Sequence, residues 1–215
     1  MVWSTSMTAN IVHQKALVRL EVVSETHVYD FHKLWSSEEA ALYSQRVVND
    51  SFEESRKTFQ ERFLDMAVSR PWVVKRAIMV PRLDGEAGQE AAGFISAATP
   101  SPNGLLLSYH LRPDCWNKGF ATAAVRMFLD EYWNVPRMAL CSEIYTGSHL
   151  GGTDQTDDAR VMEIKHLIGE VDFENKGSMR VMEKCGGRVI GTVEDELLRF
   201  QGLRSHAVWQ LNKPE

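Results

Sequence analysis

The sequence predicts a single α+β domain built on a mixed, mostly antiparallel sheet. Strand-like segments come in the order of one strand, helices, three strands and a further helix, which differs from the regular strand and helix alternation of a dinucleotide-binding fold. A strand, a Gly-containing turn and a long amphipathic helix follow one another between residues 105 and 133. The 215 residues are 44% hydrophobic and 25% charged, a composition typical of a globular domain.

Capping residues indicate where the helices begin. Thr26 is expected to cap a helix that runs to Trp35, and Ser37 to begin a short continuation. A Ser-x-x-Glu capping box at Ser51 opens another helix, which Pro71 ends. Asn175 is expected to cap the last helix.

Alternating apolar residues and flanking turns indicate the strands of the sheet. The last strand is expected to lie at an edge, because Ala207, Trp209 and Leu211 alternate with other residues. Residues 1–14 are polar and aperiodic, so we expect a loose tail before one domain at 15–213. The expected strands are 17–22, 72–80, 91–99, 105–111, 166–172, 188–193 and 205–211.

Charge, cysteine content and apolar run length exclude several classes of protein. With 24 Lys and Arg against 29 Asp and Glu, the net charge of −5 argues against nucleic-acid or anionic-membrane partners. Cys115, Cys141 and Cys185 form no Cys-x-x-Cys pair and no His pair has metal-ligand spacing, so neither disulfides nor a metal site is expected. The sequence contains no signal-peptide pattern and no run approaching the roughly 20 apolar residues of a membrane span. We therefore expect a cytoplasmic protein.

The turn at residues 116–122, called the phosphate turn below, has features of an anion-binding site. N–H groups at the start of a helix lack intrahelical acceptors and carry partial positive charge, so they can hold a diphosphate. Gly119 and Ala121 allow close approach, and Lys118 adds positive charge. An ordinary strand-to-helix connection is the alternative, since such turns are common. The helix that follows is expected to bury one face, formed by Ala121, Ala124, Val125, Phe128, Leu129 and Tyr132.

Two motifs in a fixed order carry a resemblance to a known family. The first is SYHLRP at 108–113 with WNKGFAT at 116–122, and the second is ENKGS at 174–178 followed by KCG at 184–186. Together they resemble the GCN5-related N-acetyltransferase (GNAT) superfamily, in particular its RimJ/RimL-like branch, over about residues 15–211. The resemblance implies the GNAT fold, in which a sheet of six to seven strands has helices on both faces and splayed central strands.

The resemblance also implies the chemistry. Acetyl-CoA would be the co-substrate, the phosphate turn would hold its diphosphate, and backbone N–H groups of 110–112 would polarise the thioester carbonyl. The acceptor would be an amine on a protein N-terminus, a peptide or a small molecule. The cofactor-binding residues implied in this way are His110, Leu111, Arg112, Asn117, Lys118, Gly119, Phe120, Ala121, Thr122, Asn175, Ser178 and Lys184.

Ser178 and His110 are the candidate catalytic residues. Ser178 occupies the Asn-x-x-Ser position of the RimL-like branch, where a hydroxyl can hydrogen-bond the coenzyme sulfur; its alternative role is to help cap the helix. Many relatives place a Tyr seven residues after that Asn, but here the residue is Met182. The family's frequent acidic residue after the turn is replaced by Ala123, which leaves the base open. Conceivable bases are His110, Glu143, His149, Glu170 and Asp172, although a lone strand histidine is more often packed.

Departures from the family pattern leave alternatives for the function. The missing acid at Ala123 makes a non-catalytic acyl-CoA-binding module the main alternative, and an acyl group longer than acetyl is a weaker one. Gly187 stands where the family usually has Phe, which removes a core aromatic. The protein is expected to be a monomer or a homodimer.

Residues 134–165 replace a connection that the resemblance implies should be short. Gly, Ser, Thr and Asp are abundant in this insertion, so irregular decoration and a flap over the acceptor are both open. As a flap, Asp154, Asp157 and Asp158 would favour a cationic acceptor.

Overall fold

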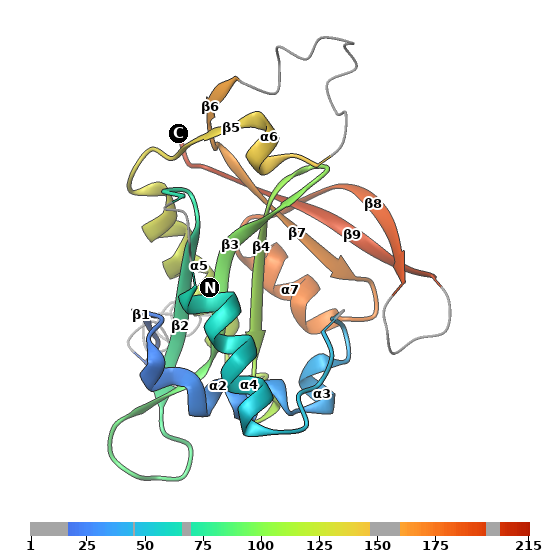
Figure 1. Ribbon diagram of the computed structural model, residues 1–215. Coiled ribbons are helices and arrows are strands. Elements are labelled where there is room, and N and C mark those ends of the chain that lie inside the picture. Colours follow the sequence, from blue (N-terminus) through green and yellow to red (C-terminus); the bar gives the residue numbers. More distant parts are fainter. Residues whose placement is uncertain (1–16, 45, 66–69, 147–159, 197–202) are drawn as a thin grey trace, which may run out of the picture. The chain divides into compact units, whose positions relative to one another are not determined.

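A mixed sheet of seven strands, in the order β1-β2-β3-β4-β7-β9-β8, organises the chain (Figure 1). The computed structural model describes residues 17–44, 46–65, 70–146, 160–196 and 203–215. Six α-helices accompany the sheet in these ranges, which confirms the expected α+β fold class. No helix in the described ranges has both the length and the apolar character needed to cross a membrane.

The seven strands of this sheet lie within a few residues of the expected ones, and 166–172 is matched at both ends, whereas β5 and β6 were not expected. The strands are β1 (Arg19–Val22), β2 (Val74–Pro81), β3 (Gln89–Ser101), β4 (Gly104–Leu111), β5 (Met138–Leu140), β6 (Val161–Glu163), β7 (His166–Asp172), β8 (Arg188–Glu196) and β9 (Leu203–Asn212). The α-helices are α2 (Val28–Trp35), α3 (Glu38–Ala41), α4 (Phe52–Phe59), α5 (Phe120–Trp133), α6 (Cys141–Ile144) and α7 (Lys176–Lys184). Shorter turns are the 3-10 helices η1 (Glu25–His27) and η3 (Pro113–Cys115) and the π-helix η2 (Gln60–Leu64).

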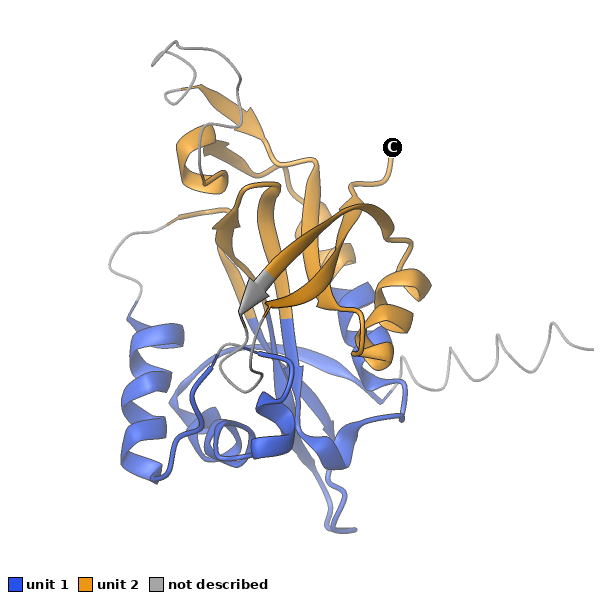
Figure 2. Cartoon of the chain, turned by 90° about the vertical axis from the view of Figure 1, so that its right-hand side faces the viewer, with its two compact units in different colours: residues 1–66, 76–95, 109–128 blue, residues 67–75, 96–108, 129–215 orange. Residues whose placement is uncertain are grey.

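Backbone contacts divide the chain into two compact units (Figure 2). Unit 1 comprises Met1–Met66, Arg76–Ile95 and Tyr109–Phe128, and unit 2 comprises Ala67–Lys75, Ser96–Ser108 and Leu129–Glu215. The single domain at 15–213 and the splay of β4 from β7 stay predictions, and the expected tail at 1–14 lies outside the described residues.

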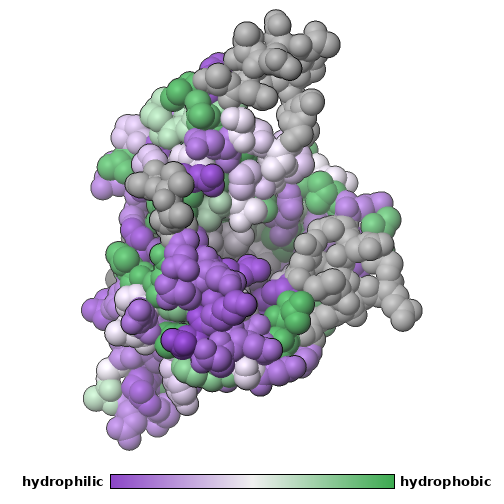
Figure 3. Space-filling model, viewed as in Figure 1, coloured by the Kyte–Doolittle hydropathy of each residue, from purple (hydrophilic) through white to green (hydrophobic). Residues whose placement is uncertain are grey.

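The core of unit 1 is aromatic. Phe31 on α2 stacks on Trp35, with ring centroids 4.1 Å apart, and meets Phe59 of α4 and Phe94 of β3 edge-on at 5.0 and 5.7 Å. All four side chains are buried, because their spacing places them on the inner sides of their helices and strand. The opposite side of α4 is charged and exposed, and Figure 3 shows the hydrophilic surface over it.

Two of the expected helix starts in unit 1 are observed and one is corrected. The capping box of α4 is present: the Glu54 N–H donates to Ser51 Oγ and the Ser51 N–H donates to Glu54 Oε2, both at 3.2 Å. Ser37 also caps α3 as expected. Thr26 is not a cap, because it lies inside η1. Ser24 is the cap of η1, since its backbone is extended and its carbonyl accepts the His27 N–H at 3.0 Å, and α2 begins directly after η1 with His27 at the cap position.

In unit 2, α7 packs against β7. Gly186 adopts a positive φ of 82° and ends the helix region, as the Gly-Gly pair predicts. A Cβ on Gly187 would lie 3.1 Å from Cε3 of Trp209, so the Trp209 ring occupies the space beside the backbone at 187. Trp209 of β9 therefore provides an aromatic ring beside position 187.

The expectation that the last strand is an edge strand is wrong. β9 pairs with β7 on one side and β8 on the other, both antiparallel. Its residues 206–209 are buried in succession, which is typical of a strand covered on both faces. The alternation read from Ala207, Trp209 and Leu211 missed that His206 and Val208 are buried as well.

The described ends of the 134–165 insertion are ordered rather than irregular. β5 and β6 pair antiparallel, with Ala139 opposite Met162, and α6 follows β5 directly. Ala139, Cys141 and Ile144 are buried, but this apolar run is too short to give a clear period in the sequence. The acidic residues Asp154, Asp157 and Asp158 and the candidate base His149 lie outside the described residues.

Candidate functional site

The phosphate turn joins the end of β4 to the start of α5 within unit 1. Asn117 and Gly119 both have positive φ, of 58° and 78°, in the left-handed region. Left-handed residues turn neighbouring backbone N–H groups toward one side, an arrangement that binds anions. The Ala123 N–H donates to the Gly119 carbonyl at 3.1 Å, so helical hydrogen bonding of α5 begins at the turn itself.

The turn presents polar residues to solvent on an anchored backbone. Asn117 and Lys118 are exposed, whereas Phe120 is buried and anchors the first turn of α5 in the core. Trp116 Nε1 donates to the Leu111 carbonyl at 2.8 Å and so ties the turn to the end of β4. Along α5, Ala124, Val125, Phe128 and Tyr132 are fully buried as expected, whereas Ala121 and Leu129 are half-buried.

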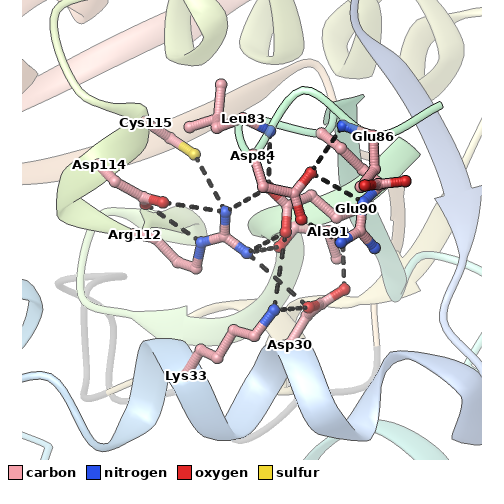
Figure 4. A network of polar contacts seen from close by, with 11 residues as sticks. Asp30, Lys33, Leu83, Asp84, Glu86, Glu90, Ala91, Arg112, Asp114 and Cys115 are labelled. Atoms are coloured by element: carbon pink, nitrogen blue, oxygen red, sulfur yellow. Dashed lines mark hydrogen bonds and ion pairs between the residues drawn. The ribbon is translucent and has the colours of Figure 1, made fainter. Parts of the chain in front are cut away.

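Arg112 has structural partners for both its main chain and its side chain. Its N–H donates to the Ala92 carbonyl at 2.8 Å, so this donor is already used between β3 and β4. Its guanidinium, 6% exposed, donates to Glu90 at 2.8 and 3.0 Å and to Asp114 at 3.1 and 3.2 Å, with Asp30 3.8 Å away (Figure 4). The Arg112 N–H is thus engaged between β3 and the end of β4, which disfavours the predicted role of its main chain in carbonyl polarisation.

This network of Arg112 with its carboxylates fixes the start of the phosphate turn. Lys33 of α2 extends it through Asp30 at 3.0 Å and Glu90 at 3.6 Å (Figure 4). Burial alone would lower the pKa of Arg112, but hydrogen bonds to Glu90 and Asp114 outweigh it and raise the pKa. The hydrogen bond from Arg112 is also the main reason that the pKa of Glu90 is lowered. Sequence spacing gave no sign of the network, because its members come from separate elements.

His110 lies in a position that suits packing better than proton transfer. Its ring meets Trp35 edge-on, with centroids 5.6 Å apart. The residue keeps partial exposure overall, but burial of the ring, followed by the charges of Arg46 and Arg62, lowers its pKa to about 4. The ring is therefore neutral near pH 7 and a weak base.

The start of α7, in unit 2, contains the other predicted site residues. Asn175 Oδ1 accepts the Ser178 N–H at 3.1 Å, so the Asn175 side chain is the helix cap. Ser178 is half-buried, and its hydroxyl has no hydrogen-bond partner in the part of the chain that the structure describes. Lys184 is exposed in the last turn of α7. The hydroxyl of Ser178 is thus not needed for the cap.

Two of the remaining conceivable bases have structural partners. Asp172 is buried and accepts two hydrogen bonds from Arg204, at 2.8 and 2.9 Å. Burial would raise the pKa of Asp172, but the hydrogen bonds, led by that of Arg204, lower it overall. Glu143 accepts the Leu140 N–H at 3.1 Å at the start of α6. Glu170 is an exposed carboxylate on β7.

The cysteines and the described acidic and histidine residues form no metal centre. Cys115, Cys141 and Cys185 are free thiols, and burial raises the pKa of Cys115 to about 12. No group of three or more His, Cys, Asp or Glu side chains is arranged to hold a metal ion within the described ranges.

A pocket of about 480 Å³ in unit 2 was not foreseen from the sequence. It lies where the insertion meets the first residues of β4 and β7, with Ile144, Tyr145, Met162 and His166 in its wall. Gly104, with φ of 127°, also lines it. The pocket depends on residues of the insertion, and no motif marks them.

The fold of the chain is similar to solved acetyltransferase structures at low sequence identity. The acetyltransferase (GNAT family) from Bacillus anthracis has 15% identity and a TM-score of 0.62, with 93% of this chain and 96% of that chain covered. Spermidine N-acetyltransferase from Vibrio cholerae, in complex with CoA and spermine, has 14% identity and a TM-score of 0.61, with 92% and 96% covered. The ribosomal L7/L12 alpha-N-protein acetyltransferase RimL has 16% identity and a TM-score of 0.61, with 91% and 90% covered.

At these identities the structural similarity establishes the fold alone. No curated protein is a significant sequence match. The sequence profile described as acetyltransferase (GNAT) domain matches residues 18–188, which is most of the chain and includes both motifs. On that match, the protein belongs to the GNAT acetyltransferase family.

Proposed function

We propose that the protein is an N-acetyltransferase that transfers the acetyl group of acetyl-CoA directly to an amine. The observation that carries the proposal is the phosphate turn, in which left-handed Asn117 and Gly119 precede a helix start within the family match. This backbone fits a diphosphate, because several N–H donors and the positive end of α5 converge there. Lys118, exposed beside them, adds a cation.

Ser178 is the residue proposed to assist the leaving group. In the reaction the amine nitrogen bonds to the thioester carbon, the C–S bond breaks, and the thiolate takes up a proton while the new ammonium loses one. A hydroxyl that donates to the sulfur stabilises it only as charge develops. The Ser178 hydroxyl is suited to this role because Asn175 already caps α7.

The base is proposed to be solvent or an exposed carboxylate rather than His110. The pKa of about 4 for His110 makes its ring a poor acceptor for the proton of an ammonium. Asp172 accepts a hydrogen bond from Arg204. Glu143 accepts one from the Leu140 N–H at the start of α6. Glu170, exposed on β7, remains a conceivable base.

The experiment that tests the function measures thiol release from acetyl-CoA by the purified protein against a panel of amines. The panel includes spermine and peptides with free N-termini, because the structurally similar proteins named above comprise a spermidine N-acetyltransferase and a ribosomal-protein N-acetyltransferase. Acetylated product identified by mass spectrometry supports the proposal. Mass spectrometry of any co-purified ligand also fixes the acyl length.

A second candidate function is a non-catalytic acyl-CoA-binding module. It is favoured by Ala123 in place of the family's acid and by the structural engagement of Asp172 and Glu143. This candidate predicts thermal stabilisation by acetyl-CoA with no thiol release across the whole panel.

A further inference from the structure

The pocket in unit 2, called the unit 2 pocket below, has the size and the walls of a site for a small molecule. Its volume of about 480 Å³ lies within the roughly 300–1,000 Å³ typical of ligand sites. None of the residues predicted to hold acetyl-CoA or to assist acetyl transfer lines it. It is therefore a separate site from the one proposed above.

Regular structure fixes the walls of the unit 2 pocket. β6, which contributes Met162, is paired along its whole length with β5 (Figure 1). Ile144 is the last residue of α6, and Tyr145 after it forms a parallel bridge with Ser101. The pocket is thus already formed in the free chain, as sites for small ligands usually are.

The walls are mostly apolar and suit an aromatic ring. Leu105, Ile144 and Ile164 are 1%, 2% and 3% exposed, so they line the pocket from the core. Met162 and Tyr145 also line it. Thioether sulfur and phenol rings both make favourable contacts with aromatic rings.

His166 gives the pocket a hydrogen-bond acceptor with a defined position. Its Nε2 lies 3.2 Å from the Asn103 carbonyl oxygen, and since a carbonyl only accepts, Nε2 carries the proton. In the neutral ring Nδ1 is then an acceptor, and it has no hydrogen-bond partner in the ranges that the structure describes. Gly104 leaves room for the ring, because a Cβ there would lie 3.0 Å from Nε2.

The charged and ionisable groups of the wall favour a neutral ligand. The carboxylate of Glu163 is paired with Lys213 at 2.5 Å, so a cationic ligand would compete with an existing ion pair. Burial is the main reason that the pKa of Tyr145 is raised, and its hydroxyl therefore stays uncharged. Lys165, the remaining charged residue of the wall, is exposed to water, which weakens its attraction for an anion.

We propose that the unit 2 pocket binds a small, neutral aromatic molecule whose hydrogen-bond donor points at Nδ1 of His166. Indole represents this class, because it has an apolar ring system and one N–H donor. Binding involves no acetyl transfer, so a test by binding alone has an outcome independent of the proposed function.

The first test compares matched probes on the full chain by NMR titration. Indole should bind with a dissociation constant below about 1 mM, a reasonable affinity for a ligand of this size. Benzofuran has the same shape but oxygen in place of the N–H, so it should bind at least about threefold more weakly. Indole-3-carboxylate should bind no more tightly than indole, because its charge must be taken out of water.

Two variants locate the binding. Met162→Trp fills the pocket and should weaken indole binding by at least about tenfold. Met138→Trp is its control, because Met138 lies on the paired strand β5, is 47% exposed and does not line the pocket. His166→Phe keeps a ring but removes the acceptor, so it should abolish the preference for indole over benzofuran.

Four results would each overturn the proposal. They are no binding of indole by the parent up to about 5 mM, equal affinities of the parent for indole and benzofuran, and parental affinity for indole in folded Met162→Trp. The fourth is tighter binding of indole-3-carboxylate, which would assign the pocket to an anionic ligand. Circular dichroism melting shows whether each variant is folded, and the comparison of probes on the parent tests the proposal without any variant.

Discussion

Gly93 in β3 lies where the end of β4 leaves no space for a side chain. A Cβ on Gly93 would lie 1.8 Å from the His110 carbonyl oxygen and 2.9 Å from Leu111 Cα. Since both contacts are with backbone, no rotamer change can relieve them. Gly93→Ala should therefore lower the free energy of unfolding by about 3 kcal/mol, measured by urea denaturation.

Gly177 provides the matched control for that substitution. A Cβ on Gly177 in α7 would have Asn175 Oδ1 3.6 Å away, which is ordinary contact. Alanine also favours helix, so Gly177→Ala should raise stability by about 0.5 kcal/mol or leave it unchanged. Equal losses in both variants would contradict the close approach at Gly93.

The role of Ser178 predicts a specific kinetic change. Ser178→Ala should lower kcat at saturating acetyl-CoA by at least about tenfold, because the hydroxyl acts as charge develops on sulfur. The dissociation constant of the coenzyme should change less than about twofold. Ser178→Thr keeps the hydroxyl and should recover part of kcat. A variant that loses thermal stability but keeps turnover would make Ser178 a structural residue only.

Single residues differ in how far the sequence reveals their role. Asn175 is read correctly as a cap, because its partner is the N–H three residues later and such a contact is local. The side-chain partner of Arg112 could not be read from the sequence, because Glu90 is 22 residues away in β3. The 1.8 Å approach at Gly93 is likewise invisible until β3 and β4 are aligned.

At the scale of elements, the phosphate turn carries the clearest prediction. Gly119→Glu should abolish coenzyme binding in a folded protein, because the carboxylate would occupy and repel the diphosphate position. Isothermal titration calorimetry with acetyl-CoA measures the dissociation constant of the coenzyme. An unchanged dissociation constant would show that the turn does not bind the coenzyme.

Gly85 is the matched control for Gly119. It lies in the turn between β2 and β3, has φ of 84°, close to the 78° of Gly119, and has nothing within 4 Å of a built Cβ. Gly85→Glu therefore introduces the same charge at a similar backbone strain. It should leave coenzyme affinity unchanged.

Elements with strong local signals were predicted well, and those defined by their neighbours were not. α5 follows its 3.6-residue period, and β7 begins and ends as expected, at His166 and Asp172. β9 was misplaced at an edge because strand order depends on pairing between distant segments. β5 and β6 were missed because three-residue strands give too short a pattern.

At the scale of the whole molecule, the described residues of each unit include an arginine–carboxylate pair with one buried partner. In unit 1 Glu90 binds Arg112, and in unit 2 Asp172 binds Arg204. Neither pairing could be predicted from the sequence, because 22 and 32 residues separate the partners. Both carboxylates have lowered pKa values in the fold.

These lowered pKa values make the stability of the protein dependent on pH. A carboxylate with a lower pKa in the folded state stabilises the fold fully above its unfolded pKa, and this contribution is lost as the pH falls through the folded pKa. For Glu90 the ordinary value is 4.5, so the loss occurs below that pH. The urea midpoint of the parent should therefore fall more steeply between about pH 5 and pH 3 than that of Glu90→Gln.

Asp172→Asn should flatten the same profile, because Asp172 loses its contribution below its ordinary value of 3.8. The two effects should add in the double variant, since the pairs share no partner. Glu39→Gln, on an exposed residue of α3, removes a carboxylate without an ion pair among the described residues and should keep the slope of the parent. If Glu90→Gln and Asp172→Asn both keep that slope as well, the acid sensitivity of the fold arises from other carboxylates, and the two pairs do not control it.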